Sequence, residues 1–184
     1  IKSKGMKCST YGSQFLLEGL CKNGETDYAI DLITNKTNRS WWNMTNVTGS
    51  KLTTEAWNGY EKPNQDWNHA WSTSPLNICT RNIIGVKPDE SGKKNIIMSP
   101  NWGNRIRKLR AKIPIYKSSI EVSYKKGKYK TKIILNIKGN NDVKYDATKV
   151  NNVFLDGTNE KYLDVKKENG KAYIIIGPGR HVIE

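Results

Sequence analysis

The stretch that decides the fold of the second half of the chain runs from Lys108 to Ile137 and reads KLRAKIPIYKSSIEVSYKKGKYKTKIILNI. Apolar side chains recur at every second position, and most positions between them are basic or polar. The apolar set includes Leu109, Ala111, Ile113, Ile115, Ile120, Val122, Tyr124, Tyr129, Ile133, Leu135 and Ile137. This period is typical of strands with one buried face, and Lys126-Gly127 marks a turn. We therefore predict three strands here.

Four further short strands fit the pattern beyond this stretch: Val153–Leu155, Tyr162–Val165, Ala172–Ile176 and His181–Ile183. Short strands at regular spacing, apolar on one face and basic on the other, predict an antiparallel β-sandwich. The lysines fall on outward positions, where they favour solubility and protect sheet edges. They are spread over several strands without the interleaved aromatic residues of a single-strand binder, so we do not expect a nucleic-acid role.

Charge divides the chain into two parts. The net charge of the 184 residues is +14. Residues 1–85 carry 9 Lys+Arg and 7 Asp+Glu, a balance of +2, so the remainder carries 31 − 9 = 22 basic and 17 − 7 = 10 acidic residues, a balance of +12. This change in composition predicts two domains. A basic second domain also leaves open an anionic polymer as its partner.

The first part has the period of helices. Residues 11–21 and a segment that starts at Glu25 each place apolar residues on one face, and Lys22-Asn23-Gly24 joins them as a helical hairpin. We predict a third helix from Trp67 to about Ile84, with Asp66 as its N-cap, a kink at Pro75 and its end at Gly85. Residues 87–92 are expected to form a linker.

The segment between the second and third helices is predicted to be a loop with one short helical turn, and it is rich in tryptophan. Five of the six tryptophans lie between Trp41 and Trp71, together with Glu55 and His69. Aromatic rings stack on sugar faces, while carboxylates, amides and imidazoles bind sugar hydroxyls, so residues 41–71, which include this loop and the start of the third helix, are a candidate carbohydrate site. The alternative is that the tryptophans form a core.

Other functional classes are poorly supported by the sequence. The mean hydropathy is -0.72, and no apolar run approaches the roughly 20 residues of a membrane span. Three widely spaced cysteines, Cys8, Cys21 and Cys79, predict buried thiols and neither a disulfide framework nor a metal site. No cofactor is expected. The chain begins at Ile1 without an initiator Met, so we expect a fragment or a processed chain.

A succession of short motifs carries a resemblance to a known family. They are Gly12-x-x-Phe15-Leu16-Leu17-Glu18, Tyr28-Ala29-x-Asp31-Leu32-Ile33-Thr34, Arg39-Ser40-Trp41-Trp42-Asn43-Met44, Thr53-Thr54-Glu55-Ala56-Trp57, Lys62-Pro63-Asn64-Gln65-Asp66-Trp67-Asn68-His69-Ala70-Trp71, Gly85-Val86-Lys87-Pro88 and Ile97-x-Ser99-Pro100. In order and spacing the chain resembles the C-terminal part of family-78 glycoside hydrolases, the bacterial α-L-rhamnosidases. The resemblance implies an α + β chain in two parts: residues 1–86 as terminal helices of an (α/α)6 barrel, and residues 87–184 as the closing β-sandwich.

The resemblance also implies the roles of individual residues. These enzymes resemble other inverting glycosidases, which need one carboxylic acid and one carboxylate base. Glu55 matches the base, with Glu61 and Asp66 as lower-ranked alternatives. His69 matches a position near the sugar hydroxyls. Trp57, Trp67 and Trp42 are the remaining residues expected to bind substrate.

The general acid and the acidic cluster that holds the sugar lie upstream in the family. We therefore expect the chain to belong to a larger hydrolase that removes terminal α-L-rhamnose, or a related α-linked sugar, and to be inactive alone. Its expected partners are a glycoside or oligosaccharide and either the missing barrel part or a second copy, with no membrane. The sequence leaves the compartment open, and the resemblance is compatible with a periplasmic or extracellular parent enzyme. A non-catalytic carbohydrate-binding module and a basic interaction module remain alternatives.

Overall fold

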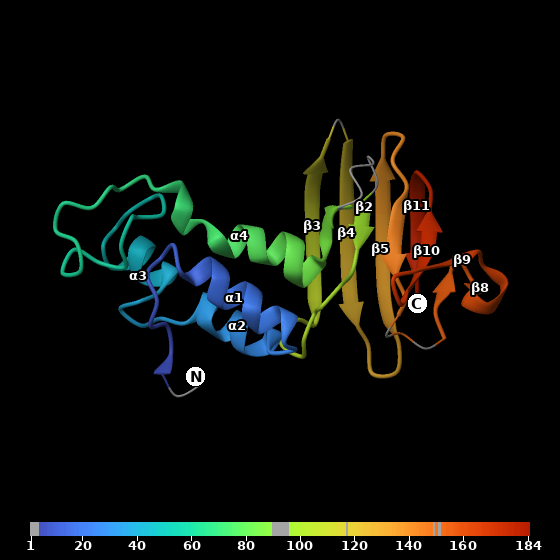
Figure 1. Ribbon diagram of the computed structural model, residues 1–184, viewed down its shortest axis with the longest axis horizontal. Helices are drawn as coiled ribbons and strands as arrows, with labels where there is room; N and C mark the ends of the chain where they lie inside the picture. The colour runs from blue at the N-terminus through green and yellow to red at the C-terminus, as the bar shows by residue number, and fades with distance from the viewer. Residues whose placement is uncertain (1–3, 90–95, 117, 149, 151) are drawn as a thin grey trace. The chain divides into compact units, whose positions relative to one another are not determined.

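The computed structural model describes residues 4–89, 96–116, 118–148, 150 and 152–184 (Figure 1). The chain divides into two compact units, residues 1–83 and 84–184. The first unit is helical and the second is built from strands. The assignment of these units to a barrel and its closing sandwich stays a prediction.

The predicted helical hairpin is confirmed. Helix α1 spans Ser13–Lys22 and helix α2 spans Thr26–Thr34. Between them Gly24 has φ +79°, a conformation that glycine adopts without strain. The amide of Glu25 donates to the Leu20 carbonyl over 2.8 Å, which closes the end of α1. Leu17 on α1 and Leu32 on α2 are among the buried residues of the two helices.

The predicted short helical turn in the long loop is α3, Trp41–Asn46. Ser40 begins it, because its hydroxyl accepts a hydrogen bond from the Asn43 amide over 3.0 Å. Met44 of α3 is fully buried. The loop is therefore anchored at its middle.

The prediction of a third helix beginning at Trp67 is wrong. A 3-10 turn, η2, spans Ala70–Ser72, helix α4 begins only at Ser74, and its continuation η3, Cys79–Ile84, is a π-helix. Asp66 caps no helix, and Pro75 lies in the first turn of α4, where its missing N–H costs no hydrogen bond. Pro75 therefore does not require a kink in α4. None of the helices in the described ranges is long and apolar enough to cross a membrane.

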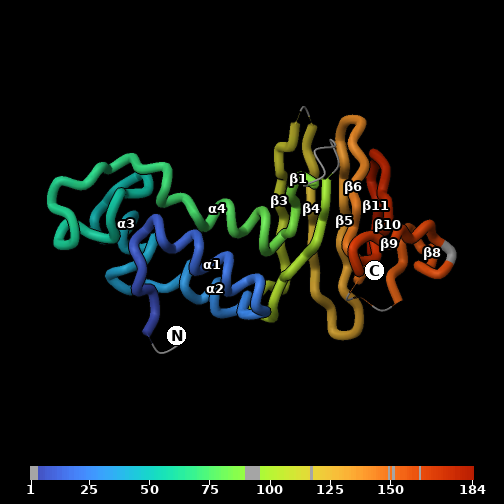
Figure 2. The backbone as a smooth tube through the Cα atoms, viewed as in Figure 1, coloured from blue at the N-terminus to red at the C-terminus, as the bar shows by residue number. Residues whose placement is uncertain are grey.

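Helices α1 and α4 lie side by side with their N-termini at the same end (Figure 2). The hydroxyls of Ser13 and Ser74, both buried, stand 2.8 Å apart. This contact ties the start of α4, and the loop that leads into it, to the start of α1.

The second unit consists of two sheets (Figure 1). One has the order β1-β2-β6-β10-β9, with β1 Val86–Pro88, β2 Ile96–Met98, β6 Val143–Asp146, β10 Lys171–Ile176 and β9 Val165–Glu168. The other has the order β3-β4-β5-β11-β7-β8, with β3 Lys108–Ile115, β4 Ser118–Lys126, β5 Thr131–Lys138, β11 Gly179–Ile183, β7 Phe154–Leu155 and β8 Thr158–Asn159. Only the β2–β6 pair is parallel among the described pairs.

The two sheets share one core, as in a sandwich. Ile120, Val122 and Leu135 of one sheet and Ile96 and Ile176 of the other are at most 1% exposed and belong to the same cluster. The prediction of antiparallel strands with one apolar face is confirmed for β3, β4 and β5. The first turn of the unit is tight: a Cβ on Gly85 (φ +82°) would lie 2.0 Å from the Ser99 carbonyl oxygen.

Several strand boundaries differ from the predictions. Tyr129 lies in the turn between β4 and β5 and is almost fully exposed. The strand predicted at Tyr162–Val165 is instead a 3-10 turn, η4 Glu160–Tyr162, followed by β9, because the Asn159 side chain caps the turn. The predicted linker begins as strand β1, whereas residues 90–92 lie outside the described residues.

Candidate functional site

Two segments of the first unit, residues 53–55 and 66–69, are joined by backbone hydrogen bonds and form the candidate site. The Glu55 amide donates to the Asp66 carbonyl over 2.9 Å, and the His69 amide donates to the Thr53 carbonyl over 2.8 Å. The Thr53 hydroxyl donates to the His69 carbonyl over 2.9 Å. This pairing fixes the positions of Glu55 and His69, which are fourteen residues apart in the sequence.

The Glu55 segment is also fixed from its other side. The Thr10 hydroxyl, which is buried, donates to the Glu55 carbonyl over 2.6 Å. The Gln65 side-chain oxygen accepts a hydrogen bond from the Ala56 amide over 3.0 Å, and Gln65 is also buried. Glu55 therefore has a rigid backbone, although its side chain remains 25% exposed.

The Glu55 carboxylate has two hydrogen-bond partners. Lys62 Nζ donates to Oε1, and the Asp66 amide donates to Oε2 over 3.2 Å. These two hydrogen bonds lower the pKa of Glu55 below its ordinary value, and the bond from Lys62 has the larger effect. Glu55 is therefore ionised at neutral pH, as a general base must be.

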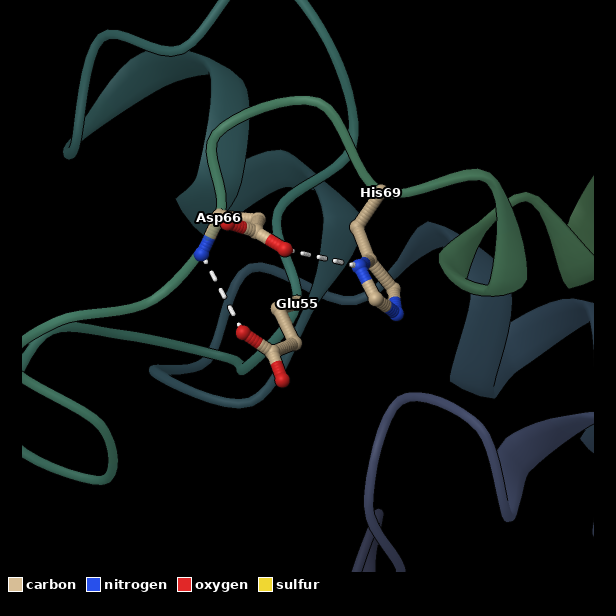
Figure 3. A group of neighbouring side chains, drawn as sticks. All are labelled: Glu55, Asp66 and His69. Carbon is tan, nitrogen blue, oxygen red and sulfur yellow. Dashed lines mark hydrogen bonds and ion pairs between the residues drawn. The ribbon is translucent and has the colours of Figure 1, made fainter.

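The carboxyls of Glu55 and Asp66 and the imidazole of His69 converge (Figure 3). One ligand atom from each lies within 4.8 Å of the others, and His69 Nδ1 stands 3.7 Å from Asp66 Oδ2. Two carboxylates and an imidazole could hold a divalent cation. The Lys62 ammonium already compensates the charge of Glu55, so a cation would have to displace it, and we assign no metal here.

The predicted tryptophans have different environments. Trp57 is fully buried: its indole N–H donates to the Cys8 carbonyl over 2.8 Å, and its ring lies edge-on to Trp41 at 4.9 Å between centroids. It offers no ring face to a sugar in this structure. Trp67 is 55% exposed, and Trp42 is partly exposed with Lys36 Nζ 5.6 Å from its ring.

Aromatic residues that sequence reasoning missed lie next to His69. Its ring stands edge-on to Trp71 at 5.5 Å, and Trp71 in turn contacts Tyr11 at 5.1 Å. Both rings are more than half exposed. Trp71 ends the motif that runs from Lys62 to Trp71, but Tyr11 is sixty residues away in the sequence, so no local signal could join them.

Lys62 is another site residue that was not predicted from the sequence, although it begins the motif that ends at Trp71. Glu61, an alternative carboxylate, is instead bound to Arg39, whose Nε lies 2.7 Å from its Oε1. Arg39 also donates to the Lys7 carbonyl over 2.9 Å. Glu61 therefore has a structural partner, while Glu55 is the carboxylate that faces His69 and Asp66.

Comparison with known proteins shows that the chain is similar to glycoside hydrolases. Residues 1–83 match the model of the bacterial alpha-L-rhamnosidase 6 hairpin glycosidase domain. An alpha-L-rhamnosidase of Alteromonas sp. (strain LOR) is 28% identical over 120 residues, which cover 61% of this chain and 13% of that protein. These findings confirm the resemblance to the family-78 glycoside hydrolases, the bacterial α-L-rhamnosidases.

Solved structures agree on the fold. The alpha-L-rhamnosidase of Dictyoglumus thermophilum superposes with a TM-score of 0.72 at 20% identity, covering 95% of this chain and 20% of that one. The Streptomyces avermitilis enzyme, solved with L-rhamnose, gives 0.68 at 21% identity, covering 94% and 17%. The chain thus spans a fifth or less of the length of these relatives.

Proposed function

We propose that this chain forms part of an inverting glycoside hydrolase that removes terminal α-L-rhamnose, or a related α-linked sugar, and that Glu55 is its general base. The observation that carries the proposal is the pairing of residues 53–55 with 66–69, which holds an ionised carboxylate beside an imidazole in the segment that matches the glycosidase domain. His69 and Trp67 are proposed to contact the sugar.

In the proposed reaction, Glu55 removes a proton from a water molecule, and the water oxygen attacks the anomeric carbon. The bond to the leaving oxygen breaks as a carboxylic acid on the opposite face protonates it. The water must fit between base and sugar, so the two carboxyl groups of an inverting enzyme stand roughly 6.5–9.5 Å apart.

Neither of the two carboxyl groups considered as alternatives, Asp66 and Glu61, fits the role of the acid. Asp66 lies too near, because its ligand oxygen is within 4.8 Å of that of Glu55. Glu61 is paired with Arg39. We therefore propose that the acid comes from another segment of a larger enzyme and that these 184 residues alone do not turn over substrate.

Exposed apolar side chains support the same proposal. Tyr11, Phe15, Trp71 and Leu76, which lie on or next to α1 and α4, are each at least half exposed. An exposed apolar surface of this kind marks an interaction site. The proposed cover is the remainder of the barrel, and in its absence a second copy. Light scattering of the isolated chain should show association, whereas a monodisperse monomer at high concentration would contradict it.

The experiment on the base compares Glu55→Gln with Glu61→Gln in the longest natural chain that contains this segment. With an aryl α-L-rhamnoside, Glu55→Gln should lower kcat by orders of magnitude with little change in binding, and Glu61→Gln should leave most of the activity. Equal, small effects would contradict the assignment.

A glycan-binding site without catalysis is the second candidate. The exposed rings of Trp67, Trp71 and Tyr11 favour it, because exposed aromatic faces bind sugars without any chemistry. In that case Glu55→Gln would weaken glycan binding, and the parent chain would show no turnover to lose.

A further inference from the structure

The second unit has a row of like charges across three strands. In the register of the sheet, Lys108 of β3 stands opposite Lys125 of β4, which stands opposite Lys132 of β5. The adjacent register positions on these strands, Leu109, Tyr124 and Ile133, belong to or pack against the core. Because successive side chains of a strand point to opposite faces, the three lysines share the outer face. All three are exposed.

This row belongs to a larger basic cluster, which we call the basic end of the sandwich. It comprises Arg105, Arg107, Lys108, Arg110, Lys125, Lys126, Lys128, Lys130 and Lys132. The segments 105–110 and 125–132 contain no acidic residue. They are joined by a backbone hydrogen bond of 2.8 Å from the Lys126 amide to the Arg107 carbonyl, next to the β4–β5 turn (Figure 1).

Two lysines of the basic end pair with a carboxylate in the described ranges. Glu184 pairs with Lys132 at 3.1 Å and Lys130 at 3.6 Å. In the part of the chain that the structure describes, no ion pair involves Lys108 or Lys125. Like charges directly opposite each other destabilise a sheet. The sandwich therefore retains an arrangement that weakens it.

Solubility and edge protection do not account for the whole cluster. β3 is an edge strand, so basic residues on it protect the edge. β4 and β5 are interior strands with no edge to protect. Solubility is served as well by mixed charges, which would avoid repulsion between Lys108, Lys125 and Lys132. An anionic ligand would turn this repulsion into attraction.

We propose that the basic end of the sandwich binds the carboxylate groups of an acidic polysaccharide. Tyr129 is the one aromatic residue in segments 105–110 and 125–132, whereas proteins that bind single-stranded nucleic acid interleave several. Proteins usually bind anionic membranes through a basic face combined with an apolar face, and segments 105–110 and 125–132 expose no apolar face. The choice of a glycan rests on the proposed function, since residues 1–83 match a glycosidase domain. The site does not require Glu55 to be catalytic.

The test is a binding measurement on the full chain, separate from any hydrolysis assay. The probes are polygalacturonate, a neutral galactan, a single-stranded oligothymidylate and vesicles of phosphatidylcholine with phosphatidylglycerol. The variant is Lys108→Gln/Lys125→Gln. Its matched control is Lys166→Gln/Lys167→Gln, which removes the same charge from exposed lysines of β9, on the edge of the other sheet.

The unmodified chain should bind polygalacturonate at low salt and not the galactan. The Lys108→Gln/Lys125→Gln variant should bind about tenfold more weakly at about 50 mM salt, with a log–log salt slope smaller by about 1.4, while the control changes little. Its Tm should stay the same or rise, which shows that it is folded.

Three results would overturn the proposal: equal loss in both double variants, equal binding to the neutral galactan, or tighter binding to the oligonucleotide or the vesicles than to polygalacturonate at the same salt. The last result would assign the basic end to nucleic acid or to lipid instead. A loss of hydrolysis in Glu55→Gln has no bearing on any of these outcomes.

Discussion

Trp57→Phe should destabilise the helical unit strongly, because Trp57 is buried and hydrogen-bonded. The substitution removes the indole N–H that the Cys8 carbonyl accepts, and a half-buried carbonyl without its partner costs about 1–3 kcal/mol. It also removes buried ring atoms that are worth about 2 kcal/mol of transfer free energy. The free energy of unfolding should fall by about 3–5 kcal/mol, since these contributions act together.

The matched control is Trp67→Phe, the same substitution at a ring that is 55% exposed, and it should change stability by less than about 1 kcal/mol. Urea unfolding followed by circular dichroism at 222 nm measures both variants and does not depend on tryptophan fluorescence. Equal, small changes in the two variants would refute the packing role of Trp57. A loss of sugar affinity in Trp57→Phe without loss of stability would restore it as a pocket wall.

Three further predictions concern charge, backbone and pH. Lys62→Gln removes the main cause of the lowered pKa of Glu55. In the active parent enzyme, the acidic limb of the pH profile of kcat/KM should therefore move to higher pH. An acidic limb at the same pH in the variant would contradict this. Gly85→Ala places a Cβ against the Ser99 carbonyl in a left-handed conformation, so calorimetry should show Tm lower by several degrees, and an unchanged Tm would refute the tight turn. Burial raises the pKa of Tyr145 to about 12, so the stability that the neutral phenol contributes is complete below the ordinary pKa of 10.0 and is lost as pH rises through 12. Between these two pH values, the free energy of unfolding of Tyr145→Phe should fall by up to about 3 kcal/mol less than that of the parent. Equal losses in the two proteins would contradict the buried phenol.

Much of the second unit could be predicted from the sequence because its strands obey a local rule. In β4 and β5 the residues at every second position are buried, which a period of two reveals directly. The strands that were missed, such as β2 and β6, have only three and four residues. Their assignment depends on the parallel pairing between segments more than forty residues apart, which no local pattern contains.

In the helical unit, the elements whose boundaries depend on local residue preferences were predicted correctly, and those whose boundaries depend on tertiary contacts were missed. The α1–α2 turn follows from Gly24 and its neighbours. The start of α4 does not, because Asp66 has the residue type of an N-cap and Trp67, Ala70 and Trp71 have helical spacing, yet the backbone at His69 pairs with Thr53 instead. The same pairing builds the candidate site. Sequence could therefore name Glu55 and His69 but not show that Lys62 and Trp71 stand beside them.

The measurement that tests the central claim most directly is azide rescue of Glu55→Ala in the longest natural chain. Without the base, turnover of an aryl α-L-rhamnoside should nearly stop. Azide needs no deprotonation, so it should attack the anomeric carbon, restore release of the aryl group and give the glycosyl azide of inverted configuration. Glu61→Ala should need no rescue. Undiminished turnover in Glu55→Ala, or lost turnover that azide leaves unchanged, would contradict the assignment of Glu55 as the base.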